Sequence, residues 1–412
     1  MVSAPVPDDG LILGVQHKSV PARFWGRTAA EVAAERHPLS EFSTPLLTLD
    51  RSASDHNVAA LMAWTDERGL KLAPHGKTTM APTLWRRLLD AGAWGLTVAT
   101  PWQAQVARAA GVERLLIANE VVDPAGIAWL AEQTDARVEI VCWVDSVEGV
   151  RLLAESAGTR PVDVLVELGA PGGRTGARGT EAALAVARAV LATPRLRLRG
   201  VAGYEGSYGA DRAPTTLARV RAYLGGLREL AETLLSWDAL VDPIVTAGGS
   251  AFFELVADEL APLAASRGRD VTVVLRSGAF QAHDDVFYDG ISPFSQPGTG
   301  SELAFRPALA VWSRVVSRPE PGLALLDAGK RDLPVDLGMP VVHGHPGAVV
   351  TAVNDQHSYL SLPADSPLAV GDVVRLGISH PCTAFDKWRL IAEVESADAT
   401  VPVVVGFVET FF

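Results

Sequence analysis

Short apolar runs alternate with segments of helical spacing through the middle of the chain. The alternation predicts eight strands, each followed by a helix, between residues 70 and 276. The expected strands are Leu70–Pro74, Gly95–Ala99, Arg114–Ala118, Val138–Val144, Val162–Glu167, Leu198–Gly203, Pro243–Thr246 and Val271–Arg276. This order is typical of a (β/α)8 TIM-like barrel. An open doubly wound sheet is the alternative, and a barrel is favoured because closure removes both edge strands.

The pattern changes after about Phe287, where short runs of β-branched residues are separated by Gly and Pro. These runs predict an all-β second domain. We expect three parts: an N-terminal arm at residues 1–43 that packs on the β domain, a barrel at 44–286 and the β domain at 287–412. A strand expected at Thr44–Leu49 exceeds the barrel count and is predicted to join the β domain.

Composition narrows the class of protein. The net charge of −12 over 412 residues argues against a nucleic-acid surface. No apolar run approaches the roughly 20 residues that span a bilayer, and no basic segment precedes an apolar run at the N-terminus. The two cysteines, Cys142 and Cys382, are too few for a disulfide framework. We therefore expect a cytoplasmic protein that acts neither on nucleic acid nor at a membrane.

Lys77 stands at the tip of the first barrel strand, in the stretch LKLAPHGKTTM. The chain has few lysines, and of these only Lys77 directly follows an expected barrel strand. Barrel enzymes carry their chemistry on the loops after the strands, and a lysine placed there can form a Schiff base. His75 lies two residues earlier. Its side chain can reach a cofactor bound to Lys77 or a substrate carboxylate, or it can be a strand-end histidine whose hydrogen bonds are all made within the protein.

Gly248, Gly249 and Ser250 follow the seventh expected strand. Paired glycines let backbone N–H groups approach an anion, and a serine at a helix N-terminus adds a hydroxyl. Phosphate sites recur at this place in barrels, so these residues are predicted to bind a phosphate.

His380 and Cys382 end an expected strand of the β domain, in the stretch GISHPC. In an extended segment residues i and i+2 point the same way, so both side chains can reach one ion. Imidazole with thiolate suits zinc. The alternative is a loop histidine beside a buried cysteine.

Three stretches in this order carry a family resemblance: TPLLTLD at Thr44–Asp50, PHGKT at Pro74–Thr78 and AGAWGLTVAT at Ala91–Thr100. Together they resemble the alanine racemase-like, fold-type III pyridoxal phosphate enzymes. Within these, the chain is most similar to the D-threonine aldolases, D-serine dehydratases and amino-acid deaminases. The resemblance implies that Lys77 carries pyridoxal 5'-phosphate and that the loop at Gly248–Ser250 binds its phosphate.

The resemblance also implies roles for other residues. Arg174 in GGRTG would face the phenolic oxygen of the cofactor, and Tyr204 in GYEG would lie beside it. His380 and Cys382 would hold a divalent metal, Zn or Mn, and His357 in DQH could be a base, an outer-shell group or an interface residue near it. The chain departs from the family at Phe280, where a tyrosine is common. His283 and Asp284 are left as polar candidates there.

The metal motif narrows the reaction. A metal acts as a Lewis acid on a β-oxygen, which a racemase does not need. We expect a lyase of β-hydroxy D-amino acids, with D-serine dehydratase-like elimination to a 2-keto acid and ammonia. A D-threonine aldolase that yields glycine and an aldehyde is the alternative, followed by an amino-acid racemase and a non-catalytic pyridoxal phosphate protein. The resemblance further implies a homodimer in which the β domain of one subunit completes the site of the other.

Overall fold

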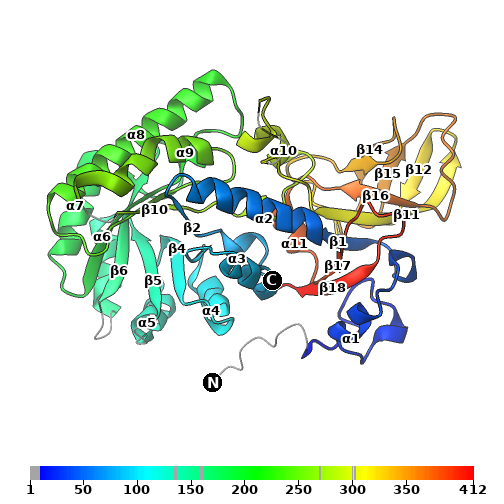
Figure 1. The fold of residues 1–412 in the computed structure, drawn as a ribbon, viewed down its shortest axis with the longest axis horizontal. Helices are drawn as coiled ribbons and strands as arrows, with labels where there is room; N and C mark the ends of the chain where they lie inside the picture. Colours follow the sequence, from blue (N-terminus) through cyan, green and yellow to red (C-terminus); the bar gives the residue numbers. More distant parts are fainter. Residues whose placement is uncertain (1–9, 134–136, 157–160, 269–270, 299, 301–302) are drawn as a thin grey trace.

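Two bodies make up the protein in the computed structural model, which describes residues 10–133, 137–156, 161–268, 271–298, 300 and 303–412. Helices and a parallel sheet form the first body, and a mixed sheet forms most of the second (Figure 1). The prediction of a β/α barrel followed by an all-β domain is confirmed. No helix in the described part of the chain is long and apolar enough to cross a membrane.

The first body is an eight-stranded barrel of parallel strands. Its strands are β2 (Lys71–Leu72), β3 (Leu96–Val98), β4 (Arg114–Glu120), β5 (Glu139–Val144), β6 (Val162–Gly169), β8 (Leu196–Gly203), β9 (Ile244–Ala247) and β10 (Thr272–Leu275). They pair in the order β2-β10-β9-β8-β6-β5-β4-β3. A parallel bridge between His75 and Thr97 joins the two ends, where Thr97 N–H donates to the Pro74 carbonyl at 2.9 Å. A short strand, β7 (Ala177–Arg178), pairs in parallel with the end of β6.

Helices surround this sheet because each buries an apolar stripe on it. They are α3 (Pro82–Asp90), α4 (Pro101–Ala109), α5 (Pro124–Glu132), α6 (Val147–Ser156), α7 (Thr180–Leu191), α8 (Pro214–Ser236) and α9 (Phe253–Leu260). Several begin with proline at the first turn, where no N–H is needed. Thr100 and Asp123 cap α4 and α5 by accepting from the N–H groups of Gln103 and Gly126. These caps end the strands at a fixed place and so fix the loops that follow them.

The β domain is a nine-stranded mixed sheet. Its strands are β1 (Leu46–Asp50), β11 (Leu309–Glu320), β12 (Leu323–Leu326), β13 (Val341–His343), β14 (Val349–Val353), β15 (Ser358–Ser361), β16 (Val373–Gly377), β17 (Leu390–Val394) and β18 (Val404–Glu409). The strand expected at Thr44–Leu49 is β1, which pairs antiparallel with β11 and parallel with β17. From β1 the chain enters α2 (Arg51–Asp66), which leads into the barrel (Figure 1).

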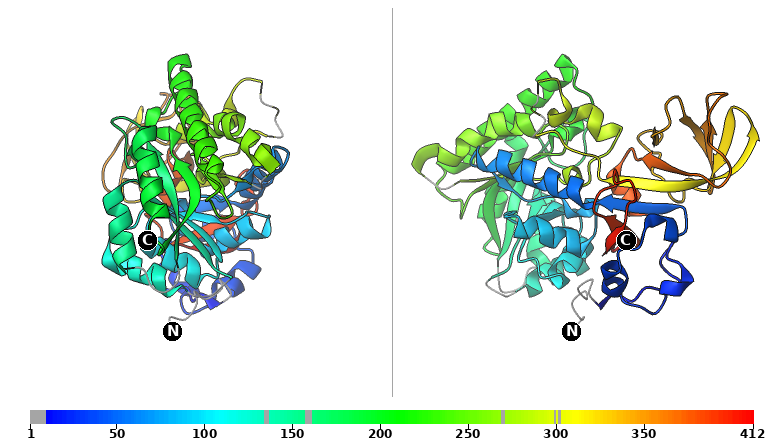
Figure 2. Two further views of the ribbon diagram at one scale, coloured as in Figure 1. Left: turned by 90° about the vertical axis from the view of Figure 1, so that its left-hand side faces the viewer. Right: turned by 45° about the vertical axis from the view of Figure 1, so that its right-hand side comes forward.

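Two short helices lie where the bodies meet: α10 (Phe287–Ile291) and α11 (Pro381–Phe385). The N-terminal arm, with α1 (Ala29–Ala34), packs on the other side of the β domain. Its Phe42 ring lies 6.2 Å from that of Phe407 on β18. The views in Figure 2 show the arm below the β domain and the hairpin of β14 and β15 at the end remote from the barrel.

Candidate active site

A cavity of about 340 Å³ opens at the carboxyl ends of the barrel strands. Seven residues predicted to bind the cofactor line it together: His75, Lys77, Arg174, Tyr204, Gly248, Gly249 and Ser250. Cys382 of the β domain lines the same cavity. The strands deliver these side chains to one place because all eight are parallel and end at the same rim.

Lys77 lies in a 3-10 turn, Gly76–Thr78, that follows β2. The indole N–H of Trp85 donates to the Gly76 carbonyl at 3.1 Å and holds this turn. Burial lowers the pKa of Lys77, and the nearby Arg174 and Arg276 lower it further, against the opposing effect of Cys382. A lysine with a lowered pKa supplies more of the neutral amine, which is the nucleophilic form.

His75 is half-buried beside Lys77. Burial, together with the positive charge of Lys77, keeps its pKa well below the usual range, so its imidazole is neutral. Its Nδ1 atom has no hydrogen-bond partner among the described residues. A buried polar atom without a partner is uncommon and is expected to bind a ligand or water.

Arg174 and Tyr204 form one wall of the cavity. The Arg174 guanidinium lies over the Tyr204 ring, 4.3 Å from its centroid. The backbone N–H of Tyr204 donates to the Tyr223 hydroxyl at 2.9 Å, and that hydroxyl donates to the Leu168 carbonyl at 2.6 Å. These contacts fix the tyrosine at the end of β8, and through it the arginine.

The phosphate loop differs from the prediction in one respect. Glu205 is fully buried, and its carboxylate accepts from the N–H groups of Gly248 and Gly249 at 3.0 and 2.7 Å. The paired glycines do bind an anion, with Gly248 at φ +111°, but the anion is a side chain of the protein. The N–H groups of Gly248 and Gly249 are therefore already engaged.

The remaining cradle lies between Ser250 and the turn after β10. The Ser250 hydroxyl accepts from the Ala279 N–H at 3.3 Å, and Gly278 and Ala279 both line the cavity. A Cβ on Gly278 would meet the His75 carbonyl oxygen at 2.5 Å, so only glycine fits. A space bounded by glycine backbone, a serine and a short turn suits a phosphate.

Arg276, at the end of β10, is a site residue that its position in the sequence did not single out as cofactor-binding. It is buried, and it donates to the Thr246 hydroxyl and the Gly203 carbonyl, both at 2.7 Å. Burial lowers its pKa, while Glu205 and Glu167 act in the opposite direction. Its position at the tip of the eighth expected strand was the feature of the sequence that could have identified it as a site residue. It supplies a fixed positive charge to the cavity.

His380 and Cys382 meet the barrel from the β domain. The Cys382 thiol donates to the Thr78 hydroxyl at 3.5 Å. His380 Nδ1 lies 2.6 Å from an oxygen of Asp336, whose other oxygen accepts from the Thr383 hydroxyl at 2.8 Å. A carboxylate behind an imidazole is the arrangement that orients a metal-binding histidine.

The predicted extended geometry of this motif is wrong. Pro381 begins α11, and His380 is the residue before the helix, so Cys382 lies in the first helical turn. Side chains meet across the turn instead of along a strand. Within the described residues, no set of three His, Cys, Asp or Glu side chains is arranged to hold an ion. His380 and Cys382 thus offer two protein ligands of the type that zinc prefers.

Three other candidates, His357, His283 and Asp284, are not among the residues that line the cavity. His357 is exposed in the turn between β14 and β15, and this hairpin is remote from the barrel (Figure 2). Phe280 is buried in the core, 6.0 Å from the Phe305 ring. His283 is buried 3.7 Å from Asp289. The structure does not bring His357 or His283 to Lys77 within one chain.

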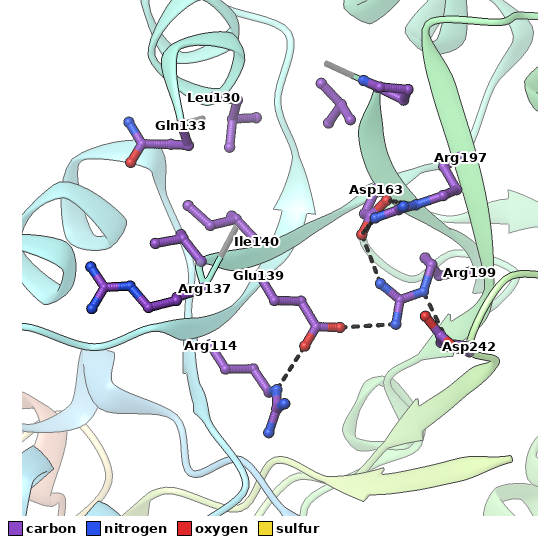
Figure 3. Close-up of a pocket in the computed structure, with 13 residues that line it drawn as sticks. Arg114, Leu130, Gln133, Arg137, Glu139, Ile140, Asp163, Arg197, Arg199 and Asp242 are labelled. Carbon is purple, nitrogen blue, oxygen red and sulfur yellow. Dashed lines mark hydrogen bonds and ion pairs between the residues drawn. The ribbon is translucent and has the colours of Figure 1, made fainter. Parts of the chain in front are cut away.

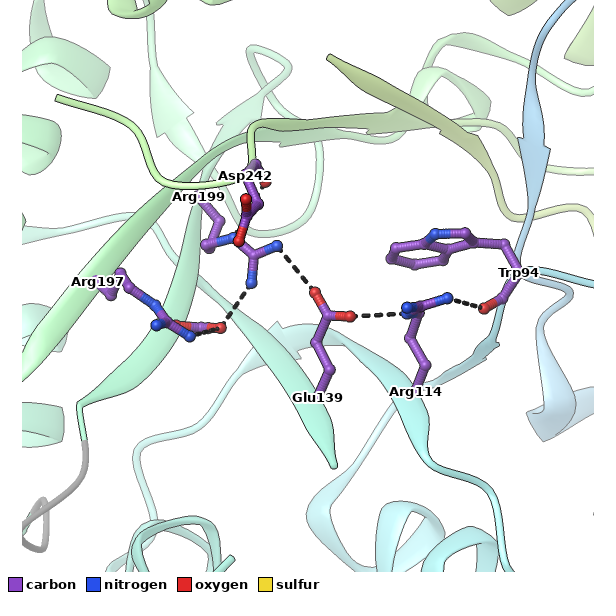
Figure 4. Close-up of polar contacts among 7 residues, drawn as sticks. Trp94, Arg114, Glu139, Arg197, Arg199 and Asp242 are labelled. Carbon is purple, nitrogen blue, oxygen red and sulfur yellow. Dashed lines mark hydrogen bonds and ion pairs between the residues drawn. The ribbon is translucent and has the colours of Figure 1, made fainter. Parts of the chain in front are cut away.

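A second cavity, of about 270 Å³, lies at the opposite end of the barrel strands (Figure 3). A chain of ion pairs runs through it. Arg199 lies between Glu139 at 2.9 Å and Asp163 at 2.7 Å, and Arg114 donates to Glu139 at 2.7 Å. Arg114 also stacks on the Trp94 ring at 4.5 Å (Figure 4). These charged groups pair with one another. We therefore interpret the ion pairs at this end of the barrel as structural contacts between neighbouring strands.

Comparison with known proteins agrees with this arrangement. The family model described as "Alanine racemase, N-terminal domain" matches residues 49–264, more than half of the chain. The D-threonine aldolase of Arthrobacter sp. is 30% identical over 85% of this chain and 88% of its own length. The chain belongs to the alanine racemase N-terminal domain family. The predicted membership, and the prediction that the chain is an enzyme of this family, are confirmed.

Further similarities extend into the β domain. A model described as "Putative serine dehydratase domain" matches residues 308–394. The D-threo-3-hydroxyaspartate dehydratase of Delftia sp. (strain HT23) is 27% identical over 84% of this chain and 92% of its own length. The crystal structure of D-threonine aldolase from Filomicrobium marinum superposes with a TM-score of 0.77, at 28% identity, over 90% of this chain and 97% of that one. The similarity to these proteins thus covers both the barrel and the β domain.

Proposed function

We propose that the protein is a lyase of β-hydroxy D-amino acids that uses pyridoxal 5'-phosphate and a divalent metal, Zn or Mn. The observation that carries the proposal is the cavity that joins Lys77, the cradle at Ser250 and Cys382. The relatives support the substrate class, because they are an aldolase of D-threonine and a dehydratase of a D-hydroxy amino acid by name.

The residues present fit the cofactor. Lys77 would hold it covalently, and Ser250 with the backbone N–H of Gly278 would bind its phosphate. Arg174 would face its phenolic oxygen, and Tyr204 would lie against it. His75 lines the same cavity, and its Nδ1 atom, which has no partner among the described residues, would bind the cofactor or a water. When bound, pyridoxal phosphate withdraws electrons from the Cα atom of an attached amino acid.

The chain's own groups prepare this chemistry. Because its pKa is lowered, the Lys77 amine can act as the base that takes a proton from the Cα atom of the substrate. Arg174 and Arg276 supply positive charge beside the developing negative charge. His380 and Cys382 would hold the metal, which would act there as a Lewis acid toward the β-oxygen. Asp336 holds His380 in place by a hydrogen bond to the Nδ1 atom of the histidine.

Between the two lyase reactions, the cysteine of the metal pair favours β-elimination. A cysteine-to-alanine variant of a D-threo-3-hydroxyaspartate dehydratase has been solved in a metal-free form, which associates a cysteine with the metal of that protein. The greater identity to the Arthrobacter enzyme favours aldol cleavage as the second candidate. The first candidate would yield a 2-keto acid and ammonia, the second glycine and an aldehyde.

The test is a panel of D-serine, D-threonine, D-threo-3-hydroxyaspartate and D-phenylserine, assayed for keto acid and for aldehyde. Lys77→Ala should abolish both the cofactor absorbance and the activity, and borohydride should label Lys77. Lys71→Ala is the matched control, since Lys71 is an exposed lysine in β2, the strand that precedes the turn of Lys77, and this variant should retain both. A cofactor-loaded protein that forms neither product from any of the four would refute the lyase.

A further inference from the structure

Tyr288 is a cavity-lining residue that the sequence did not single out. It lies in α10, at the junction of the two bodies, and lines the cavity together with Lys77 and Cys382. Its ring lies 6.4 Å from the His380 ring in an edge-on arrangement. Its hydroxyl has no hydrogen-bond partner in the described part of the chain. A tyrosine that lines a cavity and whose hydroxyl has no partner among the described residues is available to a ligand.

The backbone around Tyr288 is held on both sides. The Asp284 carboxylate accepts from the N–H groups of Val286 and Tyr288, both at 2.9 Å. The Asp285 N–H donates to the Ile378 carbonyl at 3.1 Å, two residues before His380. The segment is therefore tied to the loop between β16 and α11, which leads into the metal motif. These backbone hydrogen bonds fix the position of Tyr288, as supporting contacts do for side chains that bind ligands.

The position of Tyr288 decides which part of a substrate it meets. Lys77 marks the place of the Cα atom, and the β-domain side of the cavity, with Cys382 and His380, marks the direction of the β-substituent. Tyr288 belongs to this β-domain side through its contact with His380. Arg174, Arg276 and His75 belong to barrel loops.

We propose that Tyr288 is a specificity residue that donates a hydrogen bond to the β-oxygen of the substrate. The proposal rests on the proposed function, since only a β-hydroxy substrate has that oxygen. Asp284 is then a positioning residue, which acts on the substrate only through α10. Selection follows because an amino acid without the β-oxygen forgoes this hydrogen bond.

Tyr288→Phe tests the proposal, with D-serine and D-alanine as ligands that differ by one oxygen. Binding is measured by rapid mixing from the change in cofactor absorbance, before turnover. The variant should bind D-serine about tenfold more weakly and D-alanine unchanged, as expected for one lost hydrogen bond of about 1.4 kcal/mol. kcat/KM for the best β-hydroxy substrate should fall by at least the same factor.

Two controls separate this role from a structural one. Tyr359→Phe removes a hydroxyl on β15, outside the cavity, and should leave both ligands unchanged. Asp284→Asn keeps an oxygen for the two N–H groups and should preserve the preference for D-serine, whereas Asp284→Ala should weaken it. Cofactor content and melting temperature are checked for each variant.

An equal change for both ligands in Tyr288→Phe, or no change for either, would overturn the proposal. Its failure can be told from failure of the proposed function. If the parent protein forms no product from any β-hydroxy amino acid, the lyase is wrong, whatever the binding preference shows. If the parent forms product and Tyr288→Phe keeps its preference, only the assignment of Tyr288 is wrong.

Discussion

The Cys382 thiol lies 3.5 Å from the Thr78 hydroxyl, and Thr78 is the residue after Lys77. The metal motif and the cofactor lysine therefore meet within one chain. A shared site, which the resemblance implies, is not needed to bring Cys382 to Lys77, because α11 places Cys382 against the barrel of its own chain. The homodimer itself stays a prediction.

Mixing inactive subunits tests the intrachain site. Lys77→Ala and His380→Ala subunits, joined in verified heterodimers, should recover no activity, because each site lacks one of the two groups. Light scattering would first establish the dimer. Recovered activity would mean that His380 of one subunit serves Lys77 of the other.

Loss of the metal should stop the lyase and spare the cofactor. Chelation or Cys382→Ala should lower activity on the order of a thousandfold, since Lewis-acid stabilisation of several kcal/mol corresponds to that factor. The cofactor absorbance should remain, because Lys77 and Ser250 belong to the barrel. Cys142→Ala, at a buried cysteine remote from the motif, should retain its metal. Full activity with metal content near zero would contradict the metal's role.

Glu120 should make stability depend on pH. It lies at the end of β4, where burial, with the neighbouring Glu167 and Asp145, raises its pKa to about 8. The folded state then binds a proton more tightly than the unfolded state, so the free energy of unfolding falls as pH rises from the ordinary carboxyl range toward about 8. Glu120→Gln should flatten this decline in urea titrations. The exposed Glu229→Gln should leave it unchanged, and an equal slope in all three proteins would contradict the assignment.

Arg199 should contribute to stability and not to catalysis. Arg199→Met removes the centre of the ion-pair chain and leaves Glu139 and the buried Asp163 with fewer partners. Removing one partner of a buried pair costs about 3–5 kcal/mol. Arg221→Met, at an exposed pair with Asp258, should cost less than about 1 kcal/mol. Activity per folded molecule should be unchanged in both, and a selective loss of activity in Arg199→Met would contradict a structural role.

The strands and the cofactor lysine could be predicted because their signals are local. Buried parallel strands are continuous apolar runs, and Lys77 directly follows one of them. Contacts between distant parts of the chain could not be predicted from the sequence. Glu205 meets Gly248 across 43 residues, and Cys382 meets Thr78 across 304. No local periodicity encodes such a pair, and the helix begun by Pro381 was hidden by the β pattern around it.

The position of β1 has a consequence for the order in which the protein is made. The chain begins its mixed sheet with β1, builds the whole barrel, and returns to pair β11 beside β1. A ribosome therefore releases Lys77 and Ser250 long before Cys382. A nascent or prematurely ended chain can hold the cofactor lysine without the thiol and imidazole of the β domain. The thiol of Cys382 and the imidazole of His380 join the cavity only after the whole barrel has been synthesised.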